Sequence, residues 1–273
     1  MQAGAIPARA VIFIVAVFLI LVFVHLRWGG DAGDGVSPEQ GGPRVLRIQV
    51  KEQGQMVDLD GQGTPLDAGP TAFVDESIRQ LGQGALNERR TAAVQLAYMA
   101  NDPQEGPKLL ALGAAFERRF RQALLAGLND RDETVSRSSR QALVGWWRLS
   151  GNAALSGYVR QGVDAFEARR YEAALEAFRA ARSLGSPVPA DLHRMEAEVC
   201  LHESRFQEAK AAAQRALQAE PQHFLALHVL AQACEGLGQR EEALRAVRQA
   251  LAIYHRFPEA RELEAGLVGT GGS

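Results

Sequence analysis

An uninterrupted run of apolar residues lies near the start of the chain. Residues 10–26 read AVIFIVAVFLILVFVHL, and His25 is the one polar residue among them. As a helix, this run spans roughly 25 Å, at the short end of what a hydrocarbon core of about 30 Å requires. It has no polar face, which disfavours a helix on the surface of a soluble protein. The pattern therefore predicts a transmembrane anchor within residues 1–28.

Two other interpretations of this run stay open. A cleaved signal peptide needs small residues soon after its apolar stretch. Here Leu26, Arg27 and Trp28 follow directly, and Gly30 with Ala32 gives only a late candidate site. Arg27 and Trp28 instead suit the interface between membrane and water. The remaining interpretation is a buried helix of a soluble protein.

The charges that flank the run carry little information about orientation. Arg9 precedes the run and Arg27 follows it, so the positive-inside rule is nearly balanced. A short tail before such a run usually stays in the cytoplasm, which places the rest of the chain outside it. We expect a single-pass protein of the bacterial inner membrane whose larger part is periplasmic.

The pattern changes after residue 28. Residues 29–43 read GGDAGDGVSPEQGGP and are typical of a flexible linker. Apolar and polar residues then alternate over 44–51, which predicts a strand, and residues 56–59 form a candidate return strand. We expect a short extended or hairpin segment over 44–70 that packs on the helical part, because an isolated hairpin is marginal in water.

Helical spacing dominates from residue 71 onward. Segments 86–102 and 128–152 echo each other at an offset of 47 that aligns Leu96 with Leu143, and a helix is predicted between them over 109–126. This period and the two helices per unit resemble HEAT repeats, so a HEAT-like region is predicted over 71–152. An ordinary helical bundle is the alternative.

The C-terminal part carries a clearer repeat with a period of 34–35 residues. Its copies are 158–184, 192–221 and 225–254, and small residues recur in each at three positions: Gly162, Ala197 and Ala231; Ala174, Ala209 and Ala243; Ala181, Ala216 and Ala250. This pattern resembles the tetratricopeptide (TPR) repeat. Two features depart from that family, since Arg240 replaces the aromatic residue seen at Tyr171 and Phe206, and only Gly238 supplies the turn glycine that Arg169 and Ser204 lack.

The predicted fold class is all-α. We expect an α-α superhelix in which three TPR repeats over 155–256 follow the HEAT-like helical pairs, with an N-terminal transmembrane helix and a small β-hairpin added. Each helix pair exposes an apolar face that only a stacked neighbour can bury. A capping helix over 258–266 would cover the last such face, and residues 257–273 would hold this helix and a disordered tail.

The resemblance implies a concave groove lined by the first helix of each repeat, which suits an extended or helical peptide. The groove positions of the family also include Ser156, Asp191 and Leu225 here, and the residues predicted to bind a partner are Val159, Val163, Phe166, Arg194, Glu198, Leu201, His228, Gln232 and Glu235. That these residues form only a solvated surface is the alternative.

One partner known for the family is disfavoured by the residues present. TPR proteins that bind the acidic tails of heat-shock chaperones hold a carboxylate with lysine, asparagine and arginine. The matching positions here are all apolar: Val159, Val163, Met195, Leu225 and Val229. We therefore expect a protein or peptide partner other than those tails.

Composition excludes further classes. The 30 basic and 32 acidic residues give a net charge of −2, which argues against a nucleic-acid partner. Two cysteines are too few for a disulfide scaffold or a four-cysteine zinc site, and Cys200 and Cys234 are expected to be buried thiols. No hydrolase or metalloprotease motif is present. We predict no catalytic residue, metal or cofactor, and no enzyme activity.

Two smaller expectations concern residues 136–147. Ser136, Ser138 and Ser139 lie beside arginines and are expected on a solvated helix face. Trp146 and Trp147 are adjacent, so at most one should face the core. The other should pack near Tyr158, and an anchor at an interface is the alternative.

The leading hypothesis is a membrane-anchored scaffold or adaptor that binds a protein segment in its groove and supports assembly of a membrane or envelope complex. The alternative is an accessory subunit or lyase-like enzyme that handles a ligand with its HEAT-like region. A polar pocket near Trp146 and Tyr158 would favour the alternative, and an open groove without a buried titratable pair would favour the adaptor. Self-assembly through the solenoid ends is a third reading.

Overall fold

The computed structural model describes residues 50–52, 55–57, 70–185 and 187–269. The chain divides into two compact units, residues 1–64 and 65–273. The predicted anchor over 10–26 and the linker over 29–43 lie outside the described residues. Among the helices that the structure describes, none is both long enough and apolar enough to cross a membrane.

The first unit contains a two-stranded antiparallel sheet. Strand β1 (Val50–Glu52) pairs with β2 (Gln55–Val57) so that Val50 lies opposite Val57. These strands fall within the segment for which a hairpin is predicted. The remaining predicted strand residues, 44–49 and 58–59, are outside the described part.

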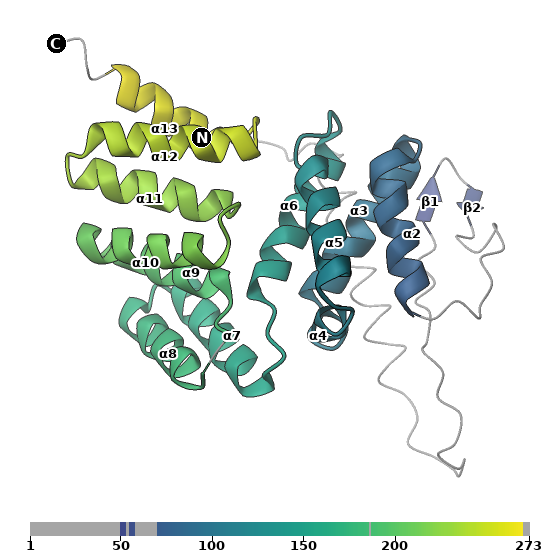
Figure 1. The fold of residues 1–273 in the computed structure, drawn as a ribbon, viewed down its shortest axis with the longest axis horizontal. Helices are drawn as coiled ribbons and strands as arrows, with labels where there is room; N and C mark the ends of the chain where they lie inside the picture. Colours follow the sequence, from purple (N-terminus) through teal and green to yellow (C-terminus); the bar gives the residue numbers. More distant parts are fainter. Residues whose placement is uncertain (1–49, 53–54, 58–69, 186, 270–273) are drawn as a thin grey trace, which may run out of the picture. The chain divides into compact units, whose positions relative to one another are not determined.

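The second unit is helical (Figure 1). Its helices in chain order are α2 (Pro70–Gln83), α3 (Leu86–Asn101), α4 (Gly106–Leu110), α5 (Ala114–Gly127), α6 (Glu133–Arg148), α7 (Ala153–Glu167), α8 (Tyr171–Ser183), α9 (Ala190–His202), α10 (Phe206–Ala219), α11 (Phe224–Gly236), α12 (Arg240–Ile253) and α13 (Pro258–Gly269).

Helices α2–α6 precede the repeats and pack on one another. Helix α2 packs on α3 and α5 on α6, while α3 also lies extensively against α6. Leu96 of α3 and Leu143 of α6, the pair that the 47-residue offset aligns, are both completely buried. The HEAT-like assignment of this region stays a prediction.

The predicted helix over 109–126 is wrong in one respect, because the chain forms two helices there. Helix α4 ends at Leu110 and α5 begins at Ala114. Between them Gly113 adopts a φ of 86°, a left-handed conformation that breaks helical continuity and that glycine adopts without a Cβ penalty. The apolar spacing of Leu109 and Leu112 continues through this break, so periodicity alone does not reveal it.

The repeats are three helical hairpins, α7/α8, α9/α10 and α11/α12, followed by α13. The predicted small positions are buried: all eight alanines have no exposed surface, namely Ala174, Ala181, Ala197, Ala209, Ala216, Ala231, Ala243 and Ala250. At Gly162 a Cβ would overlap the Phe178 ring. Small side chains at these crossings let neighbouring helices approach closely, as the repeat pattern predicts.

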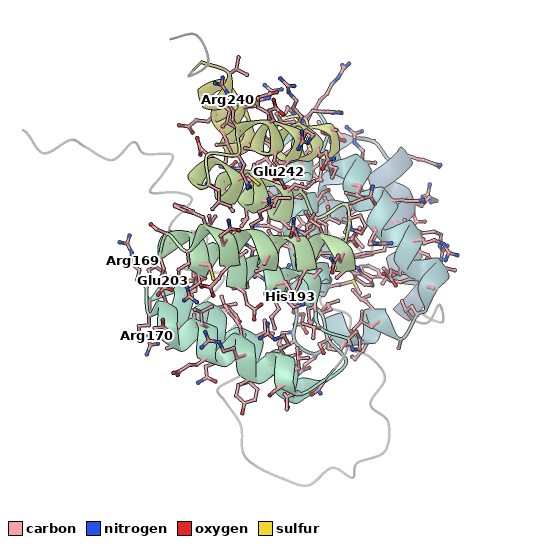
Figure 2. All side chains as sticks on the ribbon, turned by 60° about the vertical axis from the view of Figure 1, so that its left-hand side comes forward. Arg169, Arg170, His193, Glu203, Arg240 and Glu242 are labelled. Carbon is pink, nitrogen blue, oxygen red and sulfur yellow. The ribbon has the colours of Figure 1, made fainter. Side chains whose placement is uncertain are left out.

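The turn between the two helices of each repeat has the same backbone geometry in all three. Arg169, Ser204 and Gly238 have φ values of 56°, 57° and 71°. After each, a backbone N–H donates to the carbonyl five residues earlier at 2.8 Å, as from Arg205 to Cys200. Arg170 and Glu203 of the turns and Arg240 at the start of α12 lie along one edge of the stack (Figure 2). The conformation therefore recurs even where glycine is missing.

Candidate partner-binding groove

Helix α6 contacts the N-terminal ends of α9, α11 and α13. The side chain of Asp132 caps its start by accepting bonds from two backbone N–H groups. Further along, the Arg140 guanidinium lies over the Phe257 ring at 5.3 Å, and Trp147 stacks on His223 with centroids 4.0 Å apart. Seven residues of helix rise about 10.5 Å, close to the spacing of packed helices. His223 and Phe257 are equivalent positions of successive repeats, so α6 meets each in turn.

The same helix takes part in a buried cluster of charges. Asp191, which has no exposed surface, accepts hydrogen bonds from Arg148 Nε at 2.5 Å and from Arg194 Nη2 at 3.2 Å. Arg194 also pairs with Glu198 Oε1 at 2.5 Å. His223 Nε2 lies 3.2 Å from Asp191 Oδ1. This cluster joins α6, α9 and α11.

Burial and charge act oppositely on the pKa of Asp191. Burial alone would raise it, but Arg194, His223 and Arg148 together hold the pKa well below its ordinary value. Burial lowers the pKa of His223, which keeps its ring neutral, and the ring accepts a bond at Nδ1 from the Ala226 N–H. Asp191 is therefore an ionised carboxylate inside the fold.

A cavity of about 660 Å³ lies along the first helices of all three repeats. Helices α6, α7, α9, α10, α11 and α13 contribute to it, together with the residue before α13. The lining residues are Arg140, Phe166, Glu198, Leu201, His202, Phe206, Leu225, His228, Gln232, Glu235, Gly236, Phe257 and Glu259. We call this cavity the groove.

The structure brings six of the nine predicted groove residues together in the groove: Phe166, Glu198, Leu201, His228, Gln232 and Glu235. Val163 is half-buried and does not line it. Val159 and Arg194 are 5% and 4% exposed, so neither presents a surface to a partner. Arg194 turns inward because the buried Asp191 carboxylate binds it. That a partner occupies the groove stays a prediction.

Several lining residues could not be assigned from the repeat pattern. Arg140 comes from α6, whose position across the repeats depends on contacts between segments about a hundred residues apart. Phe206 begins the second helix of its repeat, and Phe257 and Glu259 belong to the cap. The aromatic residue that recurs at Tyr171 and Phe206 is the one sequence signal for Phe206.

Aromatic side chains cluster at the end of the groove formed by the first two repeats. His202 stacks on Tyr171 with centroids 5.1 Å apart and an angle of 10°, and it lies 5.6 Å from Phe166. His202 is exposed, while the two other rings are half-buried. These rings offer a flat surface on which an apolar or cationic side chain can pack.

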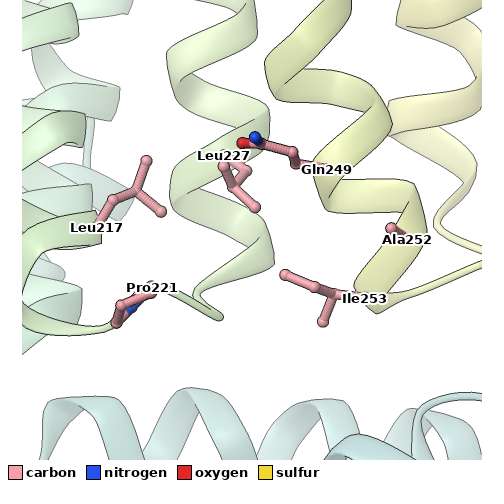
Figure 3. A pocket seen from close by; sticks show the side chains of 6 residues that line it. All are labelled: Leu217, Pro221, Leu227, Gln249, Ala252 and Ile253. Carbon is pink, nitrogen blue, oxygen red and sulfur yellow. The ribbon is translucent and has the colours of Figure 1, made fainter.

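A second, more apolar cavity of about 440 Å³ lies between α10, α11 and α12 (Figure 3). Leu217, Pro221, Leu227, Gln249, Ala252 and Ile253 line it. It shares no residue with the groove.

The expectations for residues 136–147 need correction. Trp146 and Trp147 are both buried, the first against Phe116 and Phe120 and the second against His223 and Phe224. Trp147 thus packs on the third repeat, and Tyr158 is 39% exposed.

The serines also differ from the expectation, since Ser136, Ser138 and Ser139 are all buried. Ser136 Oγ donates to the Leu128 carbonyl at 2.6 Å. Helix α6 lies between the preceding helices and the repeats. The face that carries these serines is therefore covered by protein although its side chains are polar.

Comparison with known families agrees with the repeat pattern. Residues 200–267, about a quarter of the chain, match the tetratricopeptide repeat family. The chain is also similar to the solved Arabidopsis OM64 TPR domain, with 22% identity, coverage of 42% of this chain and 93% of that one, and a TM-score of 0.41. No curated protein matches the chain.

These findings confirm the TPR prediction for residues 200–267, and the helices from α7 onward have a TPR-like superhelical fold. TPR modules are protein-interaction modules. Within the described residues, no group of three His, Cys, Asp or Glu side chains is placed to hold a metal ion.

Proposed function

We propose that this protein is an interaction scaffold that binds a segment of a partner protein in the groove. The observation that carries the proposal is the convergence of six side chains, chosen by repeat position alone, on one cavity that spans all three repeats. Half-buried apolar residues such as Phe166 and Leu201 provide area for a partner to cover, and Gln232 and Glu235 provide polar contacts.

We further propose that residues 10–26 hold the scaffold at a membrane and that it supports assembly of a membrane or envelope complex, with its larger part on the periplasmic side. The support is the length and uniform apolar character of this run and the glycine-rich linker behind it. A tether of this kind raises the effective concentration of the groove near other proteins of the same membrane.

The enzyme alternative gains little from the buried charges near Trp147. Asp191 and His223 are titratable groups at the junction, but both have no exposed surface. Neither of them lines either of the two cavities described above. A substrate would have no route to them, so we favour the scaffold.

Site-specific photocrosslinking in cells that express the full chain tests the proposal. A photoreactive residue in place of Gln232, in the groove, is compared with one in place of Gln249, in the second cavity. We expect a defined protein adduct from position 232 that is lost when Leu201→Asp is added. Equal adducts from both positions, or an adduct from position 249 alone, would contradict the proposal. Arg194 is unsuitable for this test, because its replacement would remove an ion-pair partner of the buried Asp191 carboxylate and destabilise the fold.

The membrane part has its own test. We expect the full chain to stay in the membrane pellet after alkaline washing. The double variant Val17→Arg, Leu21→Arg should be released by the same wash. Release of the unmodified chain by the wash would show that residues 10–26 do not anchor it.

A further inference from the structure

Acidic side chains predominate among the charged residues of the groove. Of the described residues that line it, Glu198, Glu235 and Glu259 carry carboxylates and Arg140 carries the one guanidinium. Burial lowers the pKa of His228, so its ring adds no positive charge at neutral pH. The groove is therefore a site for a cationic rather than an anionic group.

The three carboxylates differ in how far they are already neutralised. Glu198 pairs with Arg194, and Glu259 lies 3.3 Å from Arg140. Glu235 forms no ion pair with any residue that the structure describes, and it is exposed. It is thus the carboxylate most able to pair with a group from a partner.

The backbone adds to the negative potential at the same end of the groove. Glu235 is in the last turn of α11, which ends at Gly236. Helix α9 ends at the equivalent position of the preceding repeat, His202. Helix C-termini carry a partial negative charge that favours cations. The opposite, N-terminal ends of α9 and α11 are covered by α6 through Arg148 and Trp147.

An aromatic ring packs against the backbone of the residue that follows Glu235. A Cβ at Gly236 would lie 2.5 Å from the Phe206 ring, so the ring packs against the backbone next to Glu235. Phe206 is half-buried and lines the groove with Phe166 and Leu201. A groove that presents both a carboxylate and aromatic faces suits a basic segment, because lysine and arginine carry a charged head on an apolar stem.

Resting on the proposed function, we propose that the partner segment is basic. It places a lysine or arginine on Glu235 and seats a neighbouring aliphatic or aromatic side chain against Phe206 and Leu201.

An array of random twelve-residue peptides, probed with the purified full chain, tests this inference. We expect the bound peptides to be enriched in lysine or arginine next to aliphatic or aromatic residues. For a selected peptide, Glu235→Gln should weaken binding about tenfold, as expected for loss of one charge-assisted contact. Glu241→Gln, an exposed carboxylate at the start of α12, is the matched control and should leave binding unchanged.

The outcomes separate this inference from the function on which it rests. Two outcomes would contradict a basic partner but not the scaffold function. One is selection of acidic or uncharged peptides whose binding is lost with Leu201→Asp, and the other is a Glu235→Gln variant that binds as tightly as the parent. Two other outcomes would contradict both the basic partner and the scaffold function. These are the absence of any bound peptide, and binding that is unchanged by Leu201→Asp and by the cavity-filling Gln232→Trp. Thermal unfolding of each variant checks that it is folded.

Discussion

Trp147 stacks on His223 with ring centroids 4.0 Å apart and an angle of 25° between the rings. This contact joins the last helix before the repeats to the first helix of the third repeat, across 76 positions of sequence. Phe224 meets the same indole edge-on at 5.6 Å. The helices before the repeats therefore share one core with the third repeat and its cap.

Removal of the indole should destabilise the whole second unit. We expect Trp147→Ala to lower the free energy of unfolding by about 3–5 kcal/mol, the range for a large buried aromatic side chain. Tyr158→Ala, at an exposed position on α7, should change it by less than about 0.5 kcal/mol. Urea denaturation followed by circular dichroism measures both, and a Trp147→Ala chain as stable as the parent would show that the contact adds nothing to the core.

His223 should make stability depend on pH. Because burial lowers its pKa below the ordinary value of 6.5, the unfolded chain takes up a proton more readily than the folded one. The stabilisation is complete above about pH 6.5 and is lost as the pH falls toward the native pKa. Asp191 works in the same direction but at lower pH, since its depressed pKa keeps its stabilisation until strongly acidic conditions.

His223→Asn removes this titration and keeps an acceptor for the start of α11. We expect the free energy of unfolding to fall less for this variant than for the parent between about pH 7.5 and about pH 5.5. Part of the slope should remain, because burial also lowers the pKa of His228. Denaturation curves at a series of pH values provide the measurement, and identical slopes for the two chains would rule out His223 as the source.

Two glycines of α7 predict opposite results for the same substitution. At Gly162 an added Cβ would overlap the Phe178 ring, so Gly162→Ala should destabilise by about 1–3 kcal/mol. At Gly157 nothing lies within 4 Å of the added Cβ. Gly157→Ala should therefore stabilise by up to about 1 kcal/mol through helix propensity. Thermal unfolding distinguishes them, and equal shifts would argue against close helix crossing at residue 162.

The turns of the repeats predict a second matched pair. Ser204 and Gly238 share a left-handed conformation, which costs an ordinary residue about 1–2 kcal/mol and glycine little. Ser204→Gly should therefore stabilise the chain by about 1 kcal/mol, and Gly238→Ala should destabilise it by a similar amount. If calorimetry shows both changes to be neutral, the turns do not hold this geometry in solution.

Much of the repeat fold could be predicted because its cause is local. Alanine at Ala174, Ala209 and Ala243 recurs at the repeat period, and each is completely buried at a helix crossing. The same register selected six of the thirteen residues that line the groove, since positions on the first helix of each repeat face a common side.

What could not be predicted depends on packing between distant segments. The buried serines of α6 and the inward turn of Arg194 follow from α6 lying on the repeats, and nothing in the local sequence encodes that placement. The break at Gly113 interrupts a helix without interrupting its apolar period. Ser204 adopts a glycine-like turn because the packed helices on either side determine the path of the backbone there.

Hydrogen–deuterium exchange of the full chain, with and without a peptide selected from the random array, tests the central claim most directly. Binding in the groove predicts new protection of backbone amides in the C-terminal halves of α9 and α11, with little change around Leu217 and Ile253 in the second cavity. Protection confined to amides around the second cavity, or to amides around the exposed residues Phe73, Val94 and Tyr98 of α2 and α3, would contradict it.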